Sequence, residues 1–375
     1  MNILISPQAF KGSISAVEVA NNIEKGIFDV DKNHNLIKFP IADGGDDTLE
    51  TLVEITNGKI YKTIATGPDR KKITANWGAL GDKKTAVIEM AKISGLALLK
   101  NKELNPFIYT SYGMGEVIKN CLDHGYRKFI IGIGGSATND GGLGMAQALG
   151  AVLKDRNGNI INKGICGLGN LHEINTENMD SRIGESVFQI ACDVNNPLYG
   201  FDGATYVFGP QKGIKKDQLE TVDAYMKNYG NIIDKLSKNK ISSYPGSGAA
   251  GGIGAATMFF LKANLQSGSK IILDFLEFEK KCKGIDLIIT GEGQIDFQTL
   301  NNKAPIAVAK IAKKLNIPVY GICGILGENY KKVFDEGIHK VYPLCDNKSE
   351  IEYAIKNASK LIQQKASQLI SEFTI

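Results

Sequence analysis

Short runs of apolar, often β-branched residues alternate along most of the chain with longer stretches in which apolar residues recur every three or four positions. The short runs predict buried strands, and the longer stretches predict amphipathic helices. The predicted strands are 2–6, 85–90, 128–133, 188–192, 287–290, 319–323 and 340–343, and the main predicted helices are 16–28, 115–124, 143–153, 304–315 and 349–373. Such alternation is typical of an α/β fold with a parallel sheet covered on both faces.

Composition adds a domain count and excludes several classes of protein. A chain of 375 residues is long enough for two domains, and 43% hydrophobic with 22% charged residues is typical of a globular protein. The 44 basic and 40 acidic residues are spread along the chain, and only one Trp is present, so we expect no nucleic-acid partner. No apolar run reaches the roughly eighteen residues of a membrane span.

The six cysteines form no Cys-x-x-Cys pair and do not cluster with the four histidines. A structural zinc site is therefore not expected. Because the N-terminus opens directly on a predicted strand, without a basic region and a long apolar core, no targeting segment is expected either. These features predict a cytoplasmic protein with reduced thiols.

Glycine is concentrated in four clusters, 42–45, 132–144, 246–254 and 291–293. Most of them directly follow a predicted strand, where open α/β sheets bind their ligands. The second cluster also contains Ser136, Thr138, Asn139 and Asp140. Backbone N–H groups in a glycine-rich turn bind anions, and a nearby carboxylate suits a metal ion or a proton. This combination favours phosphoryl transfer.

A dinucleotide site is the alternative interpretation of these glycines. The segments 132–137 and 246–251 match the spacing Gly-x-Gly-x-x-Gly/Ala, and Asp155 follows the first at a suitable distance. However, Asn139 and Asp140 stand where the helix of a dinucleotide-binding fold is already running. We therefore rank a nicotinamide-dependent oxidoreductase second.

Other charged residues accompany the remaining strand ends. Lys11 lies between a predicted strand and a predicted helix, and Asp193 follows another strand. Asp43, Asp46 and Asp47 flank two glycines, although the last two also suit the N-cap of a following helix. Further groups at strand ends or in loops are Glu292, Asp296 and Lys212. The phosphate-binding sequence Gly-x-x-x-x-Gly-Lys-Ser/Thr is absent from the chain.

Taken in order, these segments resemble the bacterial glycerate kinase family with two α/β domains. The resemblance covers nearly the whole chain. Its segments are 10–13, 42–45, 89–91 with 94–96, 110–113, 132–144, 193–198, 207–213, 248–252 and 290–293.

The resemblance implies a flavodoxin-like α/β domain with a parallel sheet and a second, different α/β domain inserted into it, with the active site in the cleft between them. We place the first domain at residues 1–65 plus 285–375 and the second at 66–284. It also implies transfer of the ATP γ-phosphate to a hydroxyl of D-glycerate with Mg²⁺, giving 2-phosphoglycerate rather than 3-phosphoglycerate. A monomer or homodimer without nucleic-acid or membrane partners is expected.

We assign the site residues within this framework. Lys11 is expected to neutralise charge, and Asp140 and Asp193 are expected to serve as general base or Mg²⁺ ligand. The residues expected to bind ATP are Gly134, Gly135, Ser136, Thr138, Asn139, Gly291, Glu292 and Gly293. Those expected to bind glycerate are Ser13, Asp43, Gly44, Gly45 and Asp296.

Three departures from the family pattern qualify this assignment. Gln8 and Ala9 replace an acid and a hydroxyl residue, Asn302 replaces a glycine before Lys303, and the segment 45–48 reads Gly-Asp-Asp-Thr instead of Gly-Glu-Gly-Thr. The amide of Gln8 weakens any metal or substrate role at that position. An altered substrate preference, reduced activity or a non-catalytic ligand sensor is therefore kept as an alternative.

Overall fold

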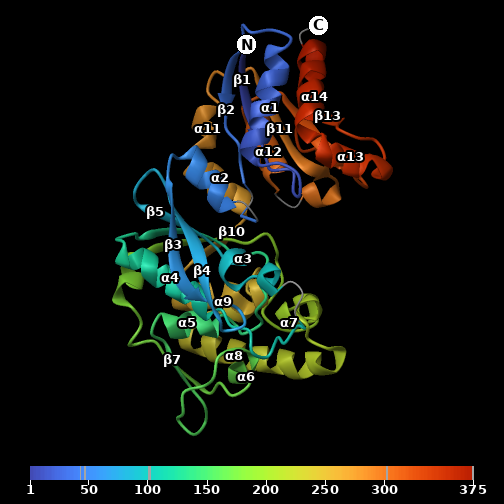
Figure 1. Cartoon of the computed structure of the whole chain (residues 1–375). Helices are drawn as coiled ribbons and strands as arrows, with labels where there is room; N and C mark the ends of the chain where they lie inside the picture. The colour runs from blue at the N-terminus through green and yellow to red at the C-terminus, as the bar shows by residue number, and fades with distance from the viewer. Residues whose placement is uncertain (43, 46–47, 100–102, 301–302, 374–375) are drawn as a thin grey trace. The chain divides into compact units, whose positions relative to one another are not determined.

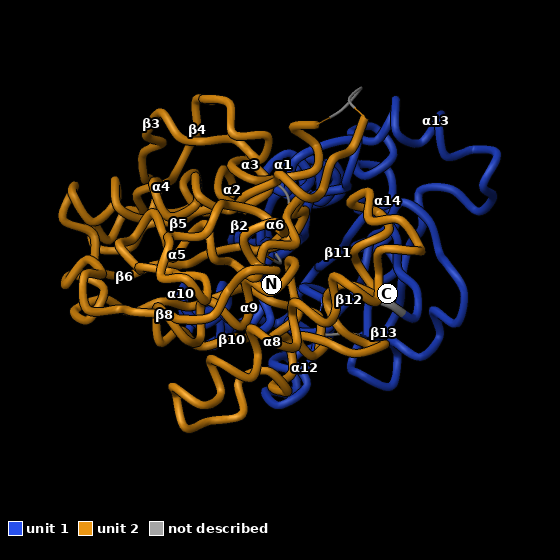
Figure 2. The backbone as a smooth tube through the Cα atoms, turned by 90° about the horizontal axis from the view of Figure 1, so that it is seen from below, with its two compact units in different colours: residues 1–43, 267–375 blue, residues 44–266 orange. Residues whose placement is uncertain are grey.

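The computed structural model of the chain describes residues 1–42, 44–45, 48–99, 103–300 and 303–373. The backbone forms two compact units, residues 1–43 with 267–375 and residues 44–266, so the second unit interrupts the first in sequence (Figures 1 and 2). From the sequence, we placed the two boundaries between the domains at 65/66 and 284/285. The structure places them earlier because strand Lys59–Thr66 pairs inside the second unit and helix Gly268–Phe275 packs inside the first.

The first unit is built on a five-stranded parallel sheet in the order β13-β12-β11-β1-β2. When these five strands are numbered 1 to 5 along the chain and the sheet is followed from β2 to β13, their order is 2-1-3-4-5. This is the strand order of flavodoxin-like folds, as predicted. The strands are β1 (Asn2–Pro7), β2 (Asn35–Lys38), β11 (Leu287–Ile295), β12 (Val319–Leu326) and β13 (Ile338–Pro343).

Helices cover both faces of this sheet because successive strand residues point to opposite sides. Ile3 and Ile5 pack into one apolar core with α1 and α14, whereas Leu4 packs into another with α11 and α12. Figure 1 shows α1 beside α14, which are in contact. The helices are α1 (Ala16–Phe28), α10 (Gly268–Phe275), α11 (Phe278–Lys281), α12 (Ala304–Lys314), α13 (Ile351–Lys356) and α14 (Ala358–Phe373).

The second unit contains a six-stranded mixed sheet in the order β10-β9-β6-β5-β4-β3. Its last four strands along the chain run parallel, and β3 and β4 extend it as an antiparallel edge. The strands are β3 (Lys59–Thr66), β4 (Lys72–Ala79), β5 (Thr85–Glu89), β6 (Lys128–Gly132), β9 (Val187–Ala191) and β10 (Asn264–Gln266); β7 (Val152–Lys154) and β8 (Glu173–Asn175) form a separate pair.

One large apolar core joins this sheet to several helices of the second unit. The α-helices of this unit are α2 (Thr48–Ile55), α3 (Ala91–Ser94), α4 (Tyr112–Asp123), α5 (Leu143–Ala148), α6 (Ile165–Leu168), α7 (Ala204–Phe208), α8 (Leu219–Ser237) and α9 (Ala249–Phe260). In the part of the chain that the structure describes, no helix combines the length and apolarity needed to cross a bilayer.

Three predicted elements differ from the structure. The helix expected at 143–153 ends at Ala148, because Gly150 takes a left-handed backbone with φ of 101°, and β7 follows. The helix expected at 349–373 is interrupted at Asn357 between α13 and α14. The strand expected at 287–290 continues to Ile295. The glycines 291–293 therefore lie inside β11 and do not form the loop that we expected.

Candidate active site

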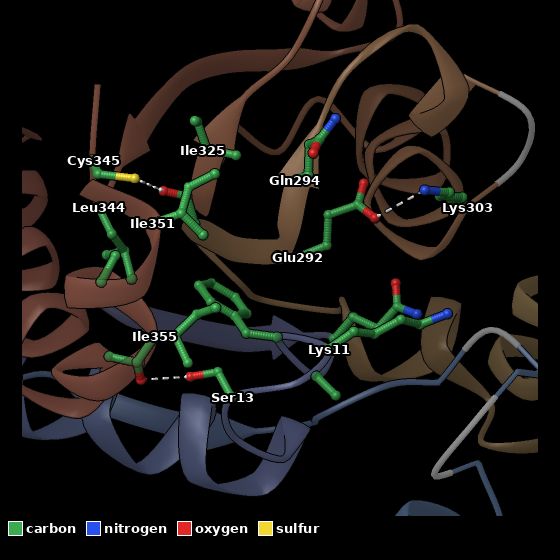
Figure 3. Close-up of a pocket in the computed structure, with 17 residues that line it drawn as sticks. Lys11, Ser13, Glu292, Gln294, Lys303, Ile325, Leu344, Cys345, Ile351 and Ile355 are labelled. Atoms are coloured by element: carbon green, nitrogen blue, oxygen red, sulfur yellow. Dashed lines mark hydrogen bonds and ion pairs between the residues drawn. The ribbon is translucent and has the colours of Figure 1, made fainter. Parts of the chain in front are cut away.

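The first unit has a pocket of about 290 Å³ at the carboxyl ends of its strands (Figure 3). It lies where the strand order reverses between β1 and β11, the point at which open α/β sheets bind ligands. The residues after β1 supply one wall, and the end of β11 supplies another. Of the residues predicted from the sequence, it brings together Lys11, Ser13, Glu292 and Gly293.

A tight turn presents Lys11 at this pocket. Phe10 and Ile14 pair through their backbones across the turn, and the Ser13 N–H donates to the Phe10 carbonyl at 2.8 Å. Gly12 takes φ of 76° at the bend, a conformation that favours glycine. The Ser13 hydroxyl donates to the carbonyl of Ile355 at 3.0 Å, which ties the turn to α13. The exposed Lys11 ammonium makes no ion pair with any described residue.

Glu292 is an acid at the opposite wall of the pocket. Its carboxylate accepts a hydrogen bond from the Thr299 hydroxyl at 2.7 Å and forms an ion pair with Lys303 at 3.5 Å. Thr299 in turn accepts a bond from the Asp296 N–H, and the Asp296 carboxylate accepts one from Gln294 at 2.7 Å. Asp296 therefore supports the wall, and Glu292 and Gln294 line it.

In the second unit, three adjacent parallel strands bring polar groups to one edge of the sheet. Glu89 at the end of β5 pairs with Gly132 at the end of β6, and Gly132 pairs with Ala191 at the end of β9. The exposed Asp193 follows β9, so it lies at the same edge as the loop after β6. This register places the loops after β5, β6 and β9 at one edge of the sheet.

At this edge of the sheet, Glu89 connects the end of β5 to the start of α2. Its buried carboxylate accepts a bond from the Leu49 N–H at the start of α2 at 2.7 Å and forms an ion pair with Lys92 at 3.0 Å. Burial raises the pKa of the Glu89 carboxyl, and the charge of Lys92 acts in the opposite direction. Gly44 packs its carbonyl against Gly132. Gly45 lies nearby in the chain, whereas Asp43, Asp46 and Asp47 lie outside the described residues.

The loop after β6 has an exposed part and a buried part. Gly134 and Gly135 are exposed, whereas Ser136, Thr138 and Asn139 are buried. The Asn139 amide donates to the Thr205 hydroxyl at 3.1 Å. The exposed glycines fit the expected anion-binding turn. The other three side chains face the protein interior.

Asp140 is fully buried beneath this loop. One carboxylate oxygen accepts bonds from the Ser111 N–H at 2.8 Å and hydroxyl at 3.0 Å, and also from the Gly144 N–H at 3.4 Å. The other accepts from the Gly142 N–H at 3.0 Å. Burial raises the pKa of the Asp140 carboxyl, and the bonds from Ser111 act in the opposite direction. In this arrangement the carboxylate orders the loop and the start of α5, and it does not face solvent.

Our site assignment left out Lys212, a buried residue at the end of the 3-10 helix Pro210–Lys212 that contacts the loop after β6. It is 1% exposed, and its ammonium donates to the Ser136 hydroxyl at 2.8 Å and the Thr138 carbonyl at 2.7 Å. Burial lowers the pKa of Lys212 to about 7, while the negative charge of Asp140 acts in the opposite direction. The sequence marked Lys212 only as a charged residue in a loop and as part of the family segment 207–213, because its burial depends on the tertiary fold.

Lys212 predicts a pH-dependent stability. An unfolded lysine has a pKa of about 10.4. Between about pH 7 and 10 the unfolded chain therefore binds a proton that folded Lys212 lacks, so this residue makes the free energy of unfolding rise with pH. We expect its contribution to approach ~1.4 kcal/mol per pH unit and to disappear in Lys212→Met. Urea unfolding at several pH values measures it.

The exposed Lys216 provides the matched control, because Lys216→Met removes a nearby lysine without emptying a buried position. The Lys216→Met curve should follow the wild-type pH dependence. Parallel curves for the wild type and Lys212→Met would instead mean that Lys212 stays protonated in the folded protein.

The dinucleotide interpretation does not fit this geometry. In a dinucleotide-binding turn the helix begins within the glycine sequence, but α5 begins only at Leu143. Gly142 precedes it with φ of 73°, and a side chain there would collide with Ala256 of α9. Asp155 accepts bonds from the backbone of Asn157 and Asn159 within an exposed turn. The glycines of 246–254 pack against the loop after β6, since the Gly141 N–H donates to the Gly251 carbonyl.

Comparisons with known proteins agree with the two-unit α/β architecture. Residues 3–374 match the glycerate kinase family. A glycerate kinase of Bacillus subtilis is 41% identical over 100% of this chain and 98% of its own length, and a glycerate 2-kinase of Escherichia coli is 43% identical over 96% and 94%. The crystal structure of a putative glycerate kinase 2 from Salmonella typhimurium superposes with a TM-score of 0.91 at 41% identity, covering 100% of this chain and 98% of that one. The chain belongs to the glycerate kinase family.

Proposed function

We propose that the protein transfers the γ-phosphate of ATP to the 2-hydroxyl of D-glycerate and forms 2-phosphoglycerate. The observation that carries this proposal is the family match, which spans both compact units. Membership of a kinase family supports ATP as the phosphate donor. The choice of the 2-hydroxyl rests on the 43% identical Escherichia coli relative, whose name is glycerate 2-kinase.

Each unit has, at the strand-end edge of its own sheet, residues suited to part of this transfer. Phosphoryl transition states are loose, so alignment and neutralisation of charge account for most of the acceleration. We assign charge neutralisation to Lys11 and phosphate binding to the exposed amides of Gly134 and Gly135. We assign to Asp193 the proton of the glycerate hydroxyl, whose oxygen bonds to the γ-phosphorus as the bond to ADP breaks.

The buried residues of the loop take a supporting role in this proposal. Ser136, Thr138 and Asn139 hold the loop in place, and Asp140 orders it from beneath. In the first unit, Glu292 and Gly293 line the pocket, whereas Gly291 lies deeper in β11. Gly44, Gly45 and Asp296 stay predicted glycerate-binding residues, whereas the Ser13 hydroxyl donates to the Ile355 carbonyl within the pocket of the first unit.

Mg²⁺ would shield the phosphate charge of ATP when bound. Mg²⁺ commonly uses one or two carboxylates together with phosphates and water. The exposed Asp193 and the pocket-lining Glu292 fit such a role. Asp140 does not fit, because both its oxygens already accept hydrogen bonds in a fully buried position.

We expect ADP release that depends on D-glycerate. In phosphorus NMR, the signal of the product should be a doublet, split by a single proton. The phosphate of 2-phosphoglycerate couples to the one proton on its carbon, whereas that of 3-phosphoglycerate couples to two. A coupled ADP-release assay over a panel of hydroxy acids, followed by phosphorus NMR, measures both. Hydride transfer to a nicotinamide, or glycerate binding without turnover, would contradict the proposal.

We further propose a cytoplasmic location and a monomeric or homodimeric assembly. All six cysteines are free thiols, which supports a reducing compartment.

A further inference from the structure

The pocket of the first unit has two chemically different ends. Figure 3 shows Leu344, Ile351 and Ile355 at one end and Lys11 and Lys303 at the other. Glycerate is a small polar acid with little apolar surface. A pocket built for glycerate alone would therefore gain nothing from its apolar end.

The apolar end is formed mainly by α13, α14 and the carboxyl end of β12. Its aliphatic side chains are Ile325, Leu344, Ile351, Ala354, Ile355 and Ala358. Small-molecule sites of this kind combine an apolar lining with a few placed polar groups, and a volume of about 290 Å³ lies close to the lower limit of their usual sizes. This end fits a flat, largely apolar ring better than a hydroxy acid.

The other end carries positive charge. Lys11 makes no ion pair with a described residue, and Lys303 is the N-cap of α12 without a side-chain cap for that helix. Free N–H groups at a helix start favour an anion. The start of α1 differs, because Ser15 and Glu18 already satisfy it through a reciprocal capping box. The charges of this end therefore favour a phosphate chain near Lys11 and Lys303.

Gln8 is a third sign of a ligand. Its side chain lines the pocket and is 5% exposed, yet its Oε1 has no hydrogen-bond partner among the described residues. A buried amide oxygen without a partner costs roughly 1–3 kcal/mol. A hydroxyl or N–H donor on a bound molecule would remove this cost. The amide that replaces the acid of the family pattern is thus placed to contact a ligand.

We infer that this pocket binds the nucleoside part of the ATP used in the proposed reaction. The base lies against the aliphatic side chains of α13 and α14, Gln8 accepts a hydrogen bond from the nucleoside, and the phosphates extend toward Lys11 and Lys303. The inference rests on the proposed function for the identity of the ligand. It goes beyond that function by assigning the base to the flavodoxin-like unit.

Placing a charge in the apolar end tests this inference. Ile355→Glu introduces a carboxylate against the base, and Tyr353→Glu introduces the same group on the same helix at an exposed position that does not line the pocket. We expect the Kd for ADP, measured by calorimetry on the full chain, to rise at least tenfold in Ile355→Glu and to stay unchanged in Tyr353→Glu. In turnover assays the KM for ATP should rise while the KM for glycerate does not.

Photolabelling provides a test that does not depend on a variant. Wild-type protein irradiated with 8-azido-ATP should carry the label within residues 344–358, and excess ADP should prevent labelling. A label elsewhere, or equal ADP affinity in Ile355→Glu and wild type, overturns the pocket assignment and leaves the proposed function standing. If wild-type protein binds no adenine nucleotide, the proposed function fails, and the pocket assignment fails with it.

Discussion

Lys11→Met is expected to lower kcat/KM for phosphoryl transfer by about a hundredfold to a thousandfold, the range seen when one charge-stabilising donor is removed from an active site. The side chain lies at the mouth of the pocket, is exposed, and makes no ion pair with a described residue. Its loss therefore removes positive charge from the reacting phosphates without disturbing the fold. Steady-state kinetics with both substrates varied measures the effect.

The exposed Lys32 of the same unit serves as the matched control, because Lys32→Met changes the net charge equally but lies outside the pocket. Its turnover and unfolding midpoint should equal those of the wild type. Lys11→Arg should recover part of the lost activity, since the charge is kept and only its geometry changes. Near-normal turnover in Lys11→Met would remove this residue from the mechanism.

The sheet of the first unit follows largely from local sequence. A parallel strand that is buried on both faces is apolar along its central residues, and 3–5 and 287–289 show this directly. The edges of the sheets were harder to predict. β2 and β3 have many exposed positions, so their apolar residues are diluted by polar ones and no continuous run marks them. The continuation of β11 through Gly291 and Gly293 depends on pairing with β12, a long-range contact.

The position of the candidate site could be predicted from the sequence, but the burial of its side chains could not. Strand ends marked by glycines located both edges, because parallel strands place their carboxyl ends together. Whether a side chain there is exposed or buried depends on neighbours far away in sequence. Asp140 is buried by the segment around Ser111, and Lys212 reaches Ser136 across 76 residues. The sequence therefore could not distinguish a reacting carboxylate from one that orders the loop.

Asp140→Asn is expected to destabilise the second unit by about 3 kcal/mol and to lower turnover with it. Three backbone N–H groups and one hydroxyl donate to the two carboxylate oxygens, and an amide nitrogen in place of one oxygen faces donors that it cannot accept from. Below about pH 7, where Lys212 is protonated, the substitution also removes the negative charge that offsets this buried ammonium. Urea unfolding and steady-state kinetics on the same samples measure both effects.

Two further variants test whether Asp140 stabilises the loop or takes part in the phosphoryl transfer. Asp217→Asn, an exposed acid in the same unit, should change neither stability nor turnover. In the double variant with Lys212→Met, measured below about pH 7, the loss of stability should be smaller than the sum of the single losses, by up to ~3 kcal/mol, because the two buried charges act on one another. If Asp140→Asn instead keeps full stability and loses turnover by orders of magnitude, its carboxylate takes part in the phosphoryl transfer. The loop must then open to expose it.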